Sequence, residues 1–334
     1  MENIVKKLLL SYQGIEVKSA KKINAFITRR IMSSLKYLEF VRVKIGYVGG
    51  RYIATALGRG AGATMSLVQA DGILEIPQNL EGIETGSPVE INLLRDEAEI
   101  RDTLVSIGSH DPIIDVINNL LKERNSEINL SSAHTGSMGG IMALKNGEAH
   151  MAPMHLLDIE SGEYNISYIK RYLPNSTIVL IKVVNRIQGL IVRKGNPLEL
   201  DDLKSIAHKK ARFVNRQRGS GTRLFLDYKL REENISPEDI NGYEREEFTH
   251  LGVASLIASG DADVGLGVYS ASRIMDLDFI PLGNEEYDFA VLEENLNHKG
   301  IQLLLDIITG DSFKNELNRL GGYDYSQIGK IIRV

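Results

Sequence analysis

The spacing of hydrophobic positions along the chain changes near residue 100. Between residues 24 and 94, short runs of alternating apolar and polar residues are separated by glycine-rich turns. In one such run, Val41, Val43 and Ile45 alternate with Arg42 and Lys44. A period of two residues is typical of half-buried β-strands, and many short strands with close turns are typical of small barrels. This region therefore predicts a small all-β barrel.

Beyond residue 102, apolar runs alternate with stretches of helical periodicity. The predicted strands are residues 103–108, 128–133, 149–153, 177–184, 187–192, 211–215 and 262–267. The predicted helices are residues 112–121, 138–144, about 201–207, about 220–234, about 249–259, about 298–309 and about 312–320. Alternating strands and helices predict an open, mostly parallel sheet, here in two lobes with residues 177–192 passing between them.

These patterns divide the chain into segments. Residues 1–17 are predicted to begin with a helix, residues 18–95 to form the barrel, and residues 102–334 to form a two-lobed domain whose second lobe spans about 186–280. The charged run Arg95–Arg101 is a candidate boundary between them. The predicted fold class is mixed: a small all-β barrel followed by a two-lobed α/β domain.

Composition and charge narrow the classes of function. The 334 residues include no cysteine, which excludes disulfides, thiolate metal sites and cysteine nucleophiles. The net charge of −5 argues against general nucleic-acid binding. Residues 1–51 nevertheless carry +8, which can indicate a basic arm for nucleic acid; we interpret it as a basic face for a neighbouring domain or solvent. No apolar run reaches the ~18 residues that a membrane span needs, and no signal peptide is recognisable. We therefore expect a cytoplasmic protein.

Small polar residues cluster where three predicted strands lead into helices. Helix N-termini favour anions, and arginine matches oxyanion geometry, so these junctions predict an anion-binding cleft between the lobes. The candidate ligand-binding residues at the junctions are Ser109, His110, Thr135, Gly136, Ser137, Arg216, Arg218, Gly219, Ser220, Gly221, Thr222 and Arg223.

Other chemistries have weaker sequence support. There is no Walker A loop and no HExxH motif, and His150 and His155 stand five residues apart, so no metal site is predicted. Ser109, His110 and Asp111 have the residue types of a catalytic triad, but a triad requires spatial apposition rather than adjacency, and no G-x-S-x-G elbow occurs. His110 and Asp111 are interpreted as cleft wall and helix cap, and no catalytic residue is predicted.

The later part of the chain resembles a known family. Phe213–Arg223 reads FVNRQRGSGTR, and Ala254–Ser272 reads ASLIASGDADVGLGVYSAS. On these stretches, residues about 103–310 resemble the type II periplasmic-binding-protein-like domains, especially the tungstate- and molybdate-binding group. The resemblance implies that Tyr269 faces the cleft and that Ser109 and Ser137 are hydroxyl donors of the first lobe.

The barrel region also resembles a known family. In order and spacing, Glu39–Val43, Ala56–Gly62, Ala70–Pro77 and Gly82–Val89 resemble the C-terminal barrel of molybdopterin molybdenumtransferases, the MoeA/gephyrin family. Residues 1–14 are similar to the last helix of that family's central domain.

The second resemblance has consequences for activity. The family's central domain, which holds molybdopterin, Mg and the catalytic carboxylates, would lie upstream of Met1, so this chain is not expected to transfer molybdenum alone. The family's barrel turn implies a supporting role for Arg59 and Ser66.

We therefore expect part of a molybdenum cofactor biosynthesis protein that binds molybdate or tungstate for metal delivery or sensing, without covalently bound cofactors. Its expected partner is a molybdopterin-binding domain or subunit, and a homodimer is compatible with the resemblance. The alternative is a regulatory module that recognises a small organic acid or a pterin. Molybdate and tungstate are too similar in size for these residues to distinguish.

Overall fold

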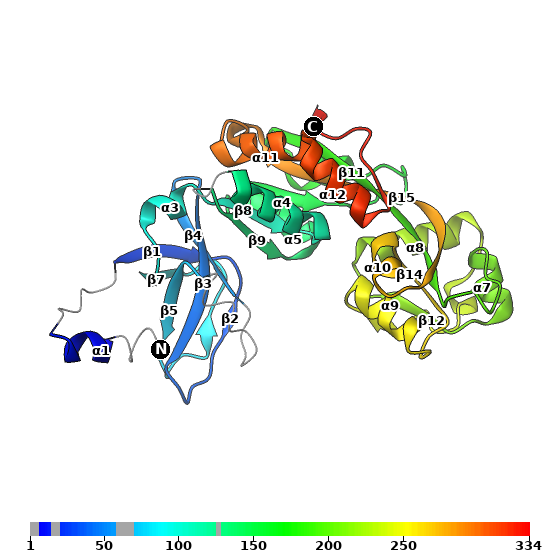
Figure 1. Ribbon diagram of the computed structural model, residues 1–334, viewed down its shortest axis with the longest axis horizontal. Helices are drawn as coiled ribbons and strands as arrows, with labels where there is room; N and C mark the ends of the chain where they lie inside the picture. The colour runs from blue at the N-terminus through cyan, green and yellow to red at the C-terminus, as the bar shows by residue number, and fades with distance from the viewer. Residues whose placement is uncertain (1–6, 15–20, 58–69, 125–127) are drawn as a thin grey trace. The chain divides into compact units, whose positions relative to one another are not determined.

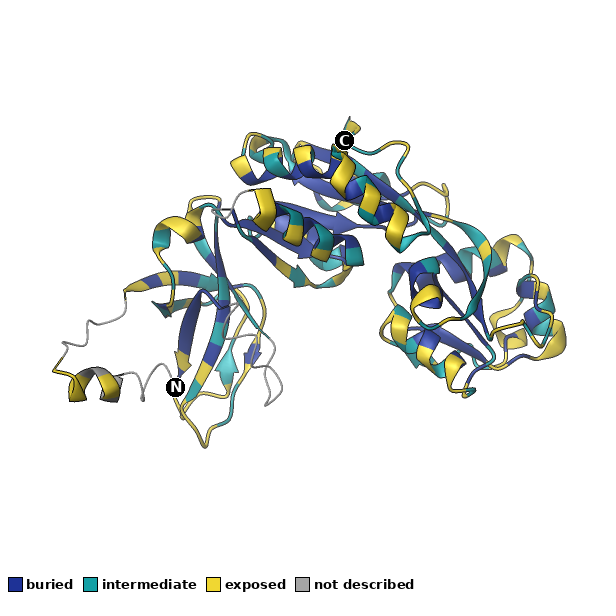
Figure 2. Ribbon diagram, in the orientation of Figure 1, coloured by how far each residue is buried: buried dark blue, intermediate teal, exposed yellow. Residues whose placement is uncertain are grey.

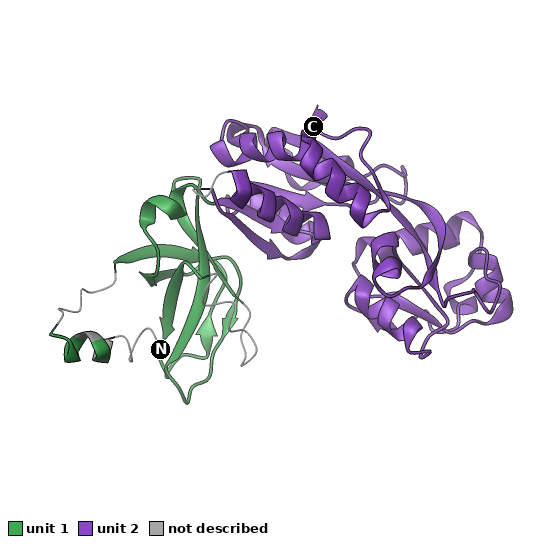
Figure 3. Ribbon diagram, in the orientation of Figure 1, with its two compact units in different colours: residues 1–103 green, residues 104–334 purple. Residues whose placement is uncertain are grey.

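The chain forms two compact units, residues 1–103 and residues 104–334 (Figure 3). The computed structural model describes residues 7–14, 21–57, 70–124 and 128–334. Within these ranges, no helix combines the length and the apolar character that a membrane span requires. The two units are described separately below.

The first unit is built on a closed five-stranded barrel with the strand order β1-β4-β3-β5-β7. β1 pairs in parallel with β4, and the other neighbours in the barrel are antiparallel. The strands of this unit are β1 (Lys22–Ile27), β2 (Ile31–Met32), β3 (Glu39–Val48), β4 (Arg51–Ala56), β5 (Gly72–Ile76), β6 (Gly82–Ile83) and β7 (Pro88–Leu93).

Alternation along the strands fills the barrel interior. Val41, Val43 and Ile45 of β3 are buried, as a strand with one face toward a core requires. The charged run predicted as a connector instead forms the short helix α3 (Glu97–Arg101), whose Ile100 is buried in the barrel core. The only described part of residues 1–17 with regular structure is α1 (Lys7–Tyr12).

The second unit contains a mixed sheet with the strand order β13-β12-β14-β11-β15-β10-β8-β9. The short strands β16 and β17 add to β11. The strands are β8 (Leu104–Gly108), β9 (Leu130–His134), β10 (Met151–Met154), β11 (Ile178–Val192), β12 (Phe213–Arg216), β13 (Glu246–Glu247), β14 (Val264–Val268), β15 (Asp278–Leu292), β16 (Tyr323–Asp324) and β17 (Ile331–Arg333).

Helices cover this sheet, and their outer faces are exposed while the strands beneath them are buried (Figure 2). The helices are α4 (Pro112–Arg124), α5 (Gly136–Lys145), α6 (Ile166–Tyr172), α7 (Leu203–Lys209), α8 (Gly221–Glu232), α9 (His250–Ala258), α10 (Tyr269–Ile274), α11 (Lys299–Thr309) and α12 (Asp311–Leu320), with 3₁₀ turns at Pro237–Asp239 and Glu293–Asn295.

Two long strands connect the two lobes of this unit. β11 and β15 pair antiparallel from Ile178 opposite Leu292 to Val192 opposite Asp278, and Figure 1 shows both running from one lobe into the other. The first lobe has a core built from β8, β9, β10, α4, α11 and α12, and the second has cores built around β12, β14, α8 and α9. The predicted fold class, a barrel followed by a two-lobed α/β domain, is confirmed.

Three details of the prediction were wrong. The predicted strands 177–184 and 187–192 form the single strand β11, and the sheet is mixed rather than mostly parallel, because β11 and β15 are antiparallel to each other and to other neighbours. The strand β15 was not predicted at all. Pro281 and Gly283 interrupt its pattern, and it carries Glu285 and Asp288 at buried positions. Those carboxylates are neutralised by basic side chains of β11, distant in sequence.

Candidate functional site

Strand-to-helix junctions place helix N-termini at the carboxyl ends of strands in both lobes. In the first lobe β8 leads to α4 and β9 leads to α5, and in the second lobe β12 leads to α8. Gly136 and Gly219 have φ angles of 76° and 83°, which glycine adopts without steric cost. The Ser220 hydroxyl accepts a hydrogen bond from the N–H of Arg223 at 3.2 Å and caps α8. First-turn N–H groups at such ends are available to an anion.

These junctions meet at one cavity of about 580 Å³, which we call the interlobe cavity. None of its lining residues is an aspartate or a glutamate. The residues that line it are Ser109, His110, His134, Thr135, Gly136, Ser137, Met138, His155, Leu156, Arg186, Arg216, Gln217, Arg218, Gly219, Ser220, Gly221, Thr222, Phe248, Thr249 and His250. The described lining thus holds three arginines and no carboxylate, so its charged side chains are all basic.

Arg216, at the end of β12, is a buried cation of the second lobe. Only 8% of this residue is exposed. Its Nη2 donates to the carbonyl oxygen of Phe248 at 2.9 Å, whereas Nη1 is buried and has no hydrogen-bond partner among the described residues. Burial, with the nearby charge of Arg186, lowers the pKa of Arg216 to about 10. A buried guanidinium with an unused donor is a group that an anion would stabilise.

His250, at the start of α9, provides a second unused polar atom. Its Nδ1 is buried and makes no hydrogen bond within the described part of the chain. Burial and the positive charges of Arg216 and Arg186 hold the pKa of His250 well below its usual range. The imidazole is therefore neutral near pH 7 and adds no charge to the lining of the cavity.

The first-lobe wall contains a chain of hydrogen bonds that starts at Ser109. The Ser109 hydroxyl lies 2.6 Å from Nε2 of His155, and Nδ1 of His155 lies 2.6 Å from Oε1 of Glu285. The other oxygen of Glu285 accepts from Nη2 of Arg186. Nη1 of Arg186 donates to Asp111 at 2.8 Å.

The charged groups in this series of hydrogen bonds stabilise one another's ionised forms. Arg186, Glu285 and Asp111 are each 2% exposed or less. Burial alone would raise the pKa of Glu285, but the charge of Arg186 and the hydrogen bond from His155 hold it below its usual range. Burial opposes the charge of Arg186 too, and the two carboxylates overcome this and raise its pKa. Both groups therefore remain ionised across the physiological range.

The structure brings most of the sequence-predicted site residues together. All of those predicted at the three junctions line the interlobe cavity except Arg223. Its guanidinium lies 3.8 Å over the ring of Tyr243 and 3.6 Å from Asp227. Tyr269 also lies outside the cavity. Its ring forms an edge-to-face contact with Phe279, with the ring centroids 5.3 Å apart.

Two further predicted residues lie outside the described part of the chain. Arg59 and Ser66, which the barrel resemblance suggested, fall within residues 58–69. Asp111 caps α4 as predicted, since its carboxylate accepts from the N–H of Ile113 at 3.0 Å. His110, expected in the cleft wall, lines the interlobe cavity.

Sequence reasoning missed His155, Arg186 and His250 as site residues. Two of them carried a readable signal. His155 follows the carboxyl end of β10, and Arg186 is, with Lys182, one of two charged residues in the largely apolar strand β11. A charge in a buried strand must find a partner, so Arg186 could have been singled out. His250 follows the N-cap Thr249 of α9, a place where histidine has no distinctive meaning.

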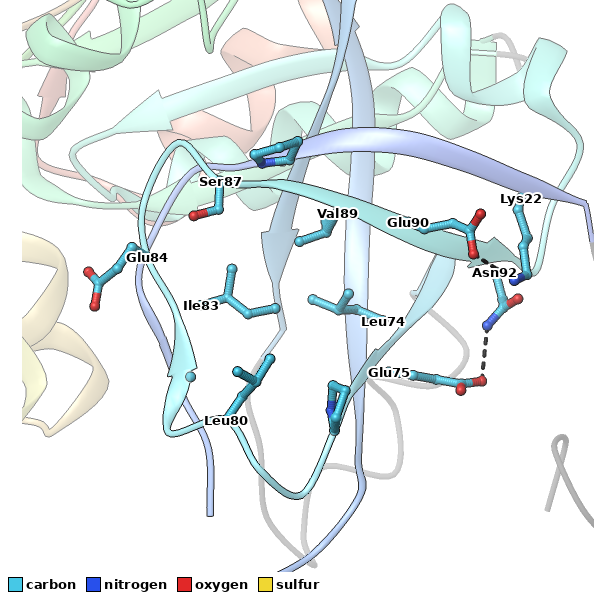
Figure 4. Close-up of a pocket in the computed structure, with 13 residues that line it drawn as sticks. Lys22, Leu74, Glu75, Leu80, Ile83, Glu84, Ser87, Val89, Glu90 and Asn92 are labelled. Carbon is cyan, nitrogen blue, oxygen red and sulfur yellow. Dashed lines mark hydrogen bonds and ion pairs between the residues drawn. The ribbon is translucent and has the colours of Figure 1, made fainter. Parts of the chain in front are cut away.

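A separate hollow of about 880 Å³ lies on the barrel unit (Figure 4). Its wall includes Glu75, Glu84 and Glu90, with Lys22 2.6 Å from Glu90 and Asn92 donating to Glu75 at 3.1 Å. The excess of carboxylates makes it unsuited to an anion. In neither unit does the described structure gather three or more histidine or carboxylate side chains in an arrangement that could hold a metal ion.

The fold and the interlobe cavity define a two-lobed ligand-binding domain. The chain belongs to the PBP superfamily, whose domain model matches residues 118–309. Residues 24–94 match the MoeA C-terminal region, domain IV. Both resemblances drawn from the sequence are thereby confirmed.

Relatives and solved structures agree with this assignment. YvgK of Bacillus subtilis is 34% identical over 228 residues, which are 68% of this chain and 73% of YvgK. MJ0666 of Methanocaldococcus jannaschii is 36% identical over 75 residues, which are 22% of this chain and 18% of MJ0666. Its name describes it as a proposed molybdopterin biosynthesis protein.

The structural matches cover the α/β unit. A proposed phosphate ABC transporter substrate-binding protein from Clostridium perfringens, with bound phosphate, matches with a TM-score of 0.52 and 15% identity over 67% of this chain and 99% of that one. The tungstate ABC transporter from Geobacter sulfurreducens matches with a TM-score of 0.50 and 13% identity over 65% of this chain and 98% of that one. At these identities the likeness concerns the fold.

Proposed function

We propose that the α/β unit binds a small tetrahedral oxyanion, molybdate or tungstate, in the interlobe cavity, and that it serves molybdenum cofactor biosynthesis by delivering or sensing the metal. The observation that carries the proposal is the unused Nη1 of the buried Arg216 in a cavity that contains no carboxylate. The match of residues 24–94 to the MoeA C-terminal region supports the link to molybdenum. The partner we propose is a molybdopterin-binding domain or subunit.

In this proposal both lobes contribute neutral donors and the second lobe contributes charge. Ser137 and Thr222, each buried at a helix start, supply hydroxyl groups. Arg216 compensates one of the two negative charges of the oxyanion, and the helix N-termini of α5 and α8 favour the other. Closure of the lobes about β11 and β15 would enclose the ligand, as in other hinged binding domains.

Isothermal titration of the full chain with molybdate, tungstate, sulfate and phosphate tests the proposal. We expect molybdate or tungstate to bind with the highest affinity. Arg216→Met should weaken binding about 100-fold, the loss of one buried charge-assisted contact of roughly 3 kcal/mol. Arg231→Met, at an exposed position of α8, is the matched control and should bind as the wild type does. Absence of heat with every oxyanion, or an Arg216→Met variant with unchanged affinity, would contradict the proposal.

A second candidate ligand, a small organic acid, is favoured by the size of the cavity. About 580 Å³ falls within the roughly 300–1,000 Å³ of pockets that hold organic ligands. The exposed ring of Phe248 and the paired rings of His110 and His134, 4.3 Å apart, line it. Titration with dicarboxylic acids and a pterin in place of the oxyanions distinguishes this candidate.

A further inference from the structure

Ser109, His155 and Glu285 have the geometry of a nucleophile, a general base and the carboxylate that orients the base. Both hydrogen bonds in the series are 2.6 Å long. The three residues come from different places in the sheet: the end of β8, the loop after β10, and the middle of β15. The sequence neighbours of Ser109 have other contacts, since Asp111 pairs with Arg186 and His110 lies 3.6 Å from Asp115.

The hydrogen bonds define the role of each nitrogen of His155. The ionised Glu285 can only accept, so Nδ1 of His155 carries the proton that it receives. Nε2 then has its lone pair toward Ser109 and accepts the hydroxyl proton. A serine hydroxyl whose base is oriented in this way by a third group is the signature of an activated nucleophile.

The surroundings hold this arrangement in place. Tyr287 donates to the carbonyl oxygen of Ser109 at 2.7 Å, and its ring stacks on the His155 imidazole with centroids 6.0 Å apart. The N–H of His155 donates to the Ser137 hydroxyl at 3.1 Å. Gly221 packs so closely that a Cβ there would stand 2.2 Å from Nδ1 of His155. Catalytic groups need such support to keep a productive geometry.

The buried charges favour proton transfer from Ser109 to His155. Arg186 contributes one positive charge to the chain of hydrogen bonds, and Glu285 and Asp111 contribute two negative charges. The net charge of the three groups is therefore −1, and an imidazolium formed on His155 would neutralise it. In a buried site such compensation lowers the cost of the charge that forms during the reaction.

The cavity also contains hydrogen-bond donors that could stabilise the tetrahedral intermediate of ester hydrolysis. A tetrahedral oxyanion and the tetrahedral intermediate of ester hydrolysis share their shape and their negative oxygen. The first turns of α5 and α8 line the cavity that contains Ser109, and their N–H groups are available to such an intermediate. Donors placed for an anion are the donors that stabilise such an intermediate.

We propose that Ser109 is a catalytic nucleophile and that the interlobe cavity hydrolyses an ester of a small anionic organic acid. This activity goes beyond the proposed oxyanion binding. The absence of carboxylates and the presence of Arg216 select a substrate with an anionic group, and the volume of about 580 Å³ accommodates an organic molecule. Arg216 binds the anionic group of the substrate.

The reaction balances with water as the only co-reactant. Ser109 Oγ forms a bond to the ester carbonyl carbon and gives its proton to Nε2 of His155. The bond from that carbon to the alcohol oxygen breaks, and His155 returns the proton to the departing alkoxide. Water then attacks the acyl-serine and gives a proton to His155, which passes it to Ser109 as the acyl–oxygen bond breaks. The products are the free acid and the alcohol.

Labelling with a fluorophosphonate, which reacts with activated serines, tests the inference on the full chain. We expect a single adduct, located on Ser109 by peptide mass spectrometry. Ser109→Ala should remove it, and His155→Gln should slow labelling about 10²- to 10⁴-fold, the usual contribution of a general base. Ser255→Ala, an exposed serine on α9, is the matched control and should label at the wild-type rate. Thermal melts of all variants verify folding.

Hydrolysis of p-nitrophenyl hydrogen succinate and of neutral p-nitrophenyl acetate provides the second readout. We expect a higher kcat/KM for the anionic ester, and loss of this preference in Arg216→Met. An unlabelled Ser109 in folded protein, together with ester hydrolysis no faster than in Ser109→Ala, would overturn the inference.

Titration with molybdate, performed separately, keeps the two proposals distinct. Oxyanion binding with neither Ser109 labelling nor Ser109-dependent ester hydrolysis leaves a binding site and refutes the nucleophile. Labelling without heat from any of the four oxyanions supports the nucleophile and refutes the oxyanion proposal.

Discussion

Arg216 illustrates how one side chain can prepare a site for its ligand. Its guanidinium is buried with one nitrogen unpaired, and leaving a buried donor unsatisfied costs about 1–3 kcal/mol. In the proposed binding, an anion that reaches Nη1 would remove that cost, so part of the binding free energy would come from satisfying a donor that the free protein leaves unpaired. The Nε of Arg186 is also buried without a partner among the described residues. The first-lobe wall therefore contains an unsatisfied buried donor too.

Asp288 of β15 is a single residue with a measurable effect on stability. It is 1% exposed, receives a hydrogen bond from Asn165 at 2.8 Å and pairs with Lys182 at 2.9 Å. Burial raises its pKa to about 6 despite Lys182. Because the folded state then holds the proton more tightly than the unfolded state does, Asp288 makes the fold more stable as the pH falls through 6.

We therefore expect a difference in pH dependence between the wild type and Asp288→Asn. Between about pH 7 and about pH 5, the free energy of unfolding of the wild type should gain about 1 kcal/mol relative to the variant. Urea denaturation at a series of pH values measures it. Asp276→Asn, at an exposed position, is the control and should follow the wild type. Parallel curves for wild type and Asp288→Asn would contradict the raised pKa.

At the scale of elements, the buried chain of charges joins two strands and a helix. Arg186 belongs to β11, Glu285 to β15, and Asp111 caps α4. Tyr323 of β16 adds a hydrogen bond to Asp111 at 2.9 Å. Removing one member of a buried charge network leaves its partners uncompensated, which costs more than the network contributes when intact.

Arg186→Met should therefore lower the free energy of unfolding of the α/β unit by about 3–5 kcal/mol. The combination Arg186→Met, Glu285→Gln and Asp111→Asn removes the charges together and should recover part of that loss. Chemical denaturation of both variants measures the difference. A single variant within 1 kcal/mol of the wild type, or a triple variant less stable than the single one, would contradict the account.

At the scale of the whole molecule, the chain has two units with separate hydrophobic cores. The barrel core contains residues 23–100, and the cores of the α/β unit contain residues 104–317. A domain with its own hydrophobic core can in principle fold and unfold on its own.

We expect differential scanning calorimetry of the full chain to show two transitions. Molybdate should raise the transition temperature of the α/β unit only. The free energy of unfolding of that unit should increase by RT ln(1 + [L]/Kd), which is about 2.7 kcal/mol at a concentration 100 times Kd. Arg186→Met should lower that same transition and thereby identify it. One cooperative transition that shifts as a whole with ligand would contradict the independence of the units.

Local patterns in the sequence were sufficient to predict several parts of this molecule. Alternation along Val41–Ile45 and glycine-rich turns predicted the barrel, and the small polar residues before α4, α5 and α8 predicted residues that line the interlobe cavity. These features depend on a few neighbouring residues, because strand alternation, helix capping and the charge at a helix start are short-range properties.

The contacts between distant residues could not be predicted in this way. His155 is 46 residues from Ser109 and 130 residues from Glu285. The direction of β11 against β15 was likewise unpredictable, since a strand buried on both faces has the same pattern in either pairing. Burial of Glu285 and Asp288 is tolerable only because Arg186 and Lys182 lie opposite them.

The amino-acid order thus determines the barrel, the alternating α/β elements and the small polar residues at the strand-to-helix junctions, because each follows from periodicity or from the chemistry of adjacent residues. Whether Ser109 is only a donor or an activated nucleophile depends on the tertiary structure. The pairing of β11 with β15, and of β8 and β15 with β10, brings an imidazole and a buried carboxylate to the hydroxyl. A hydrogen bond of 2.6 Å exists only when packing brings residues far apart in the chain into contact.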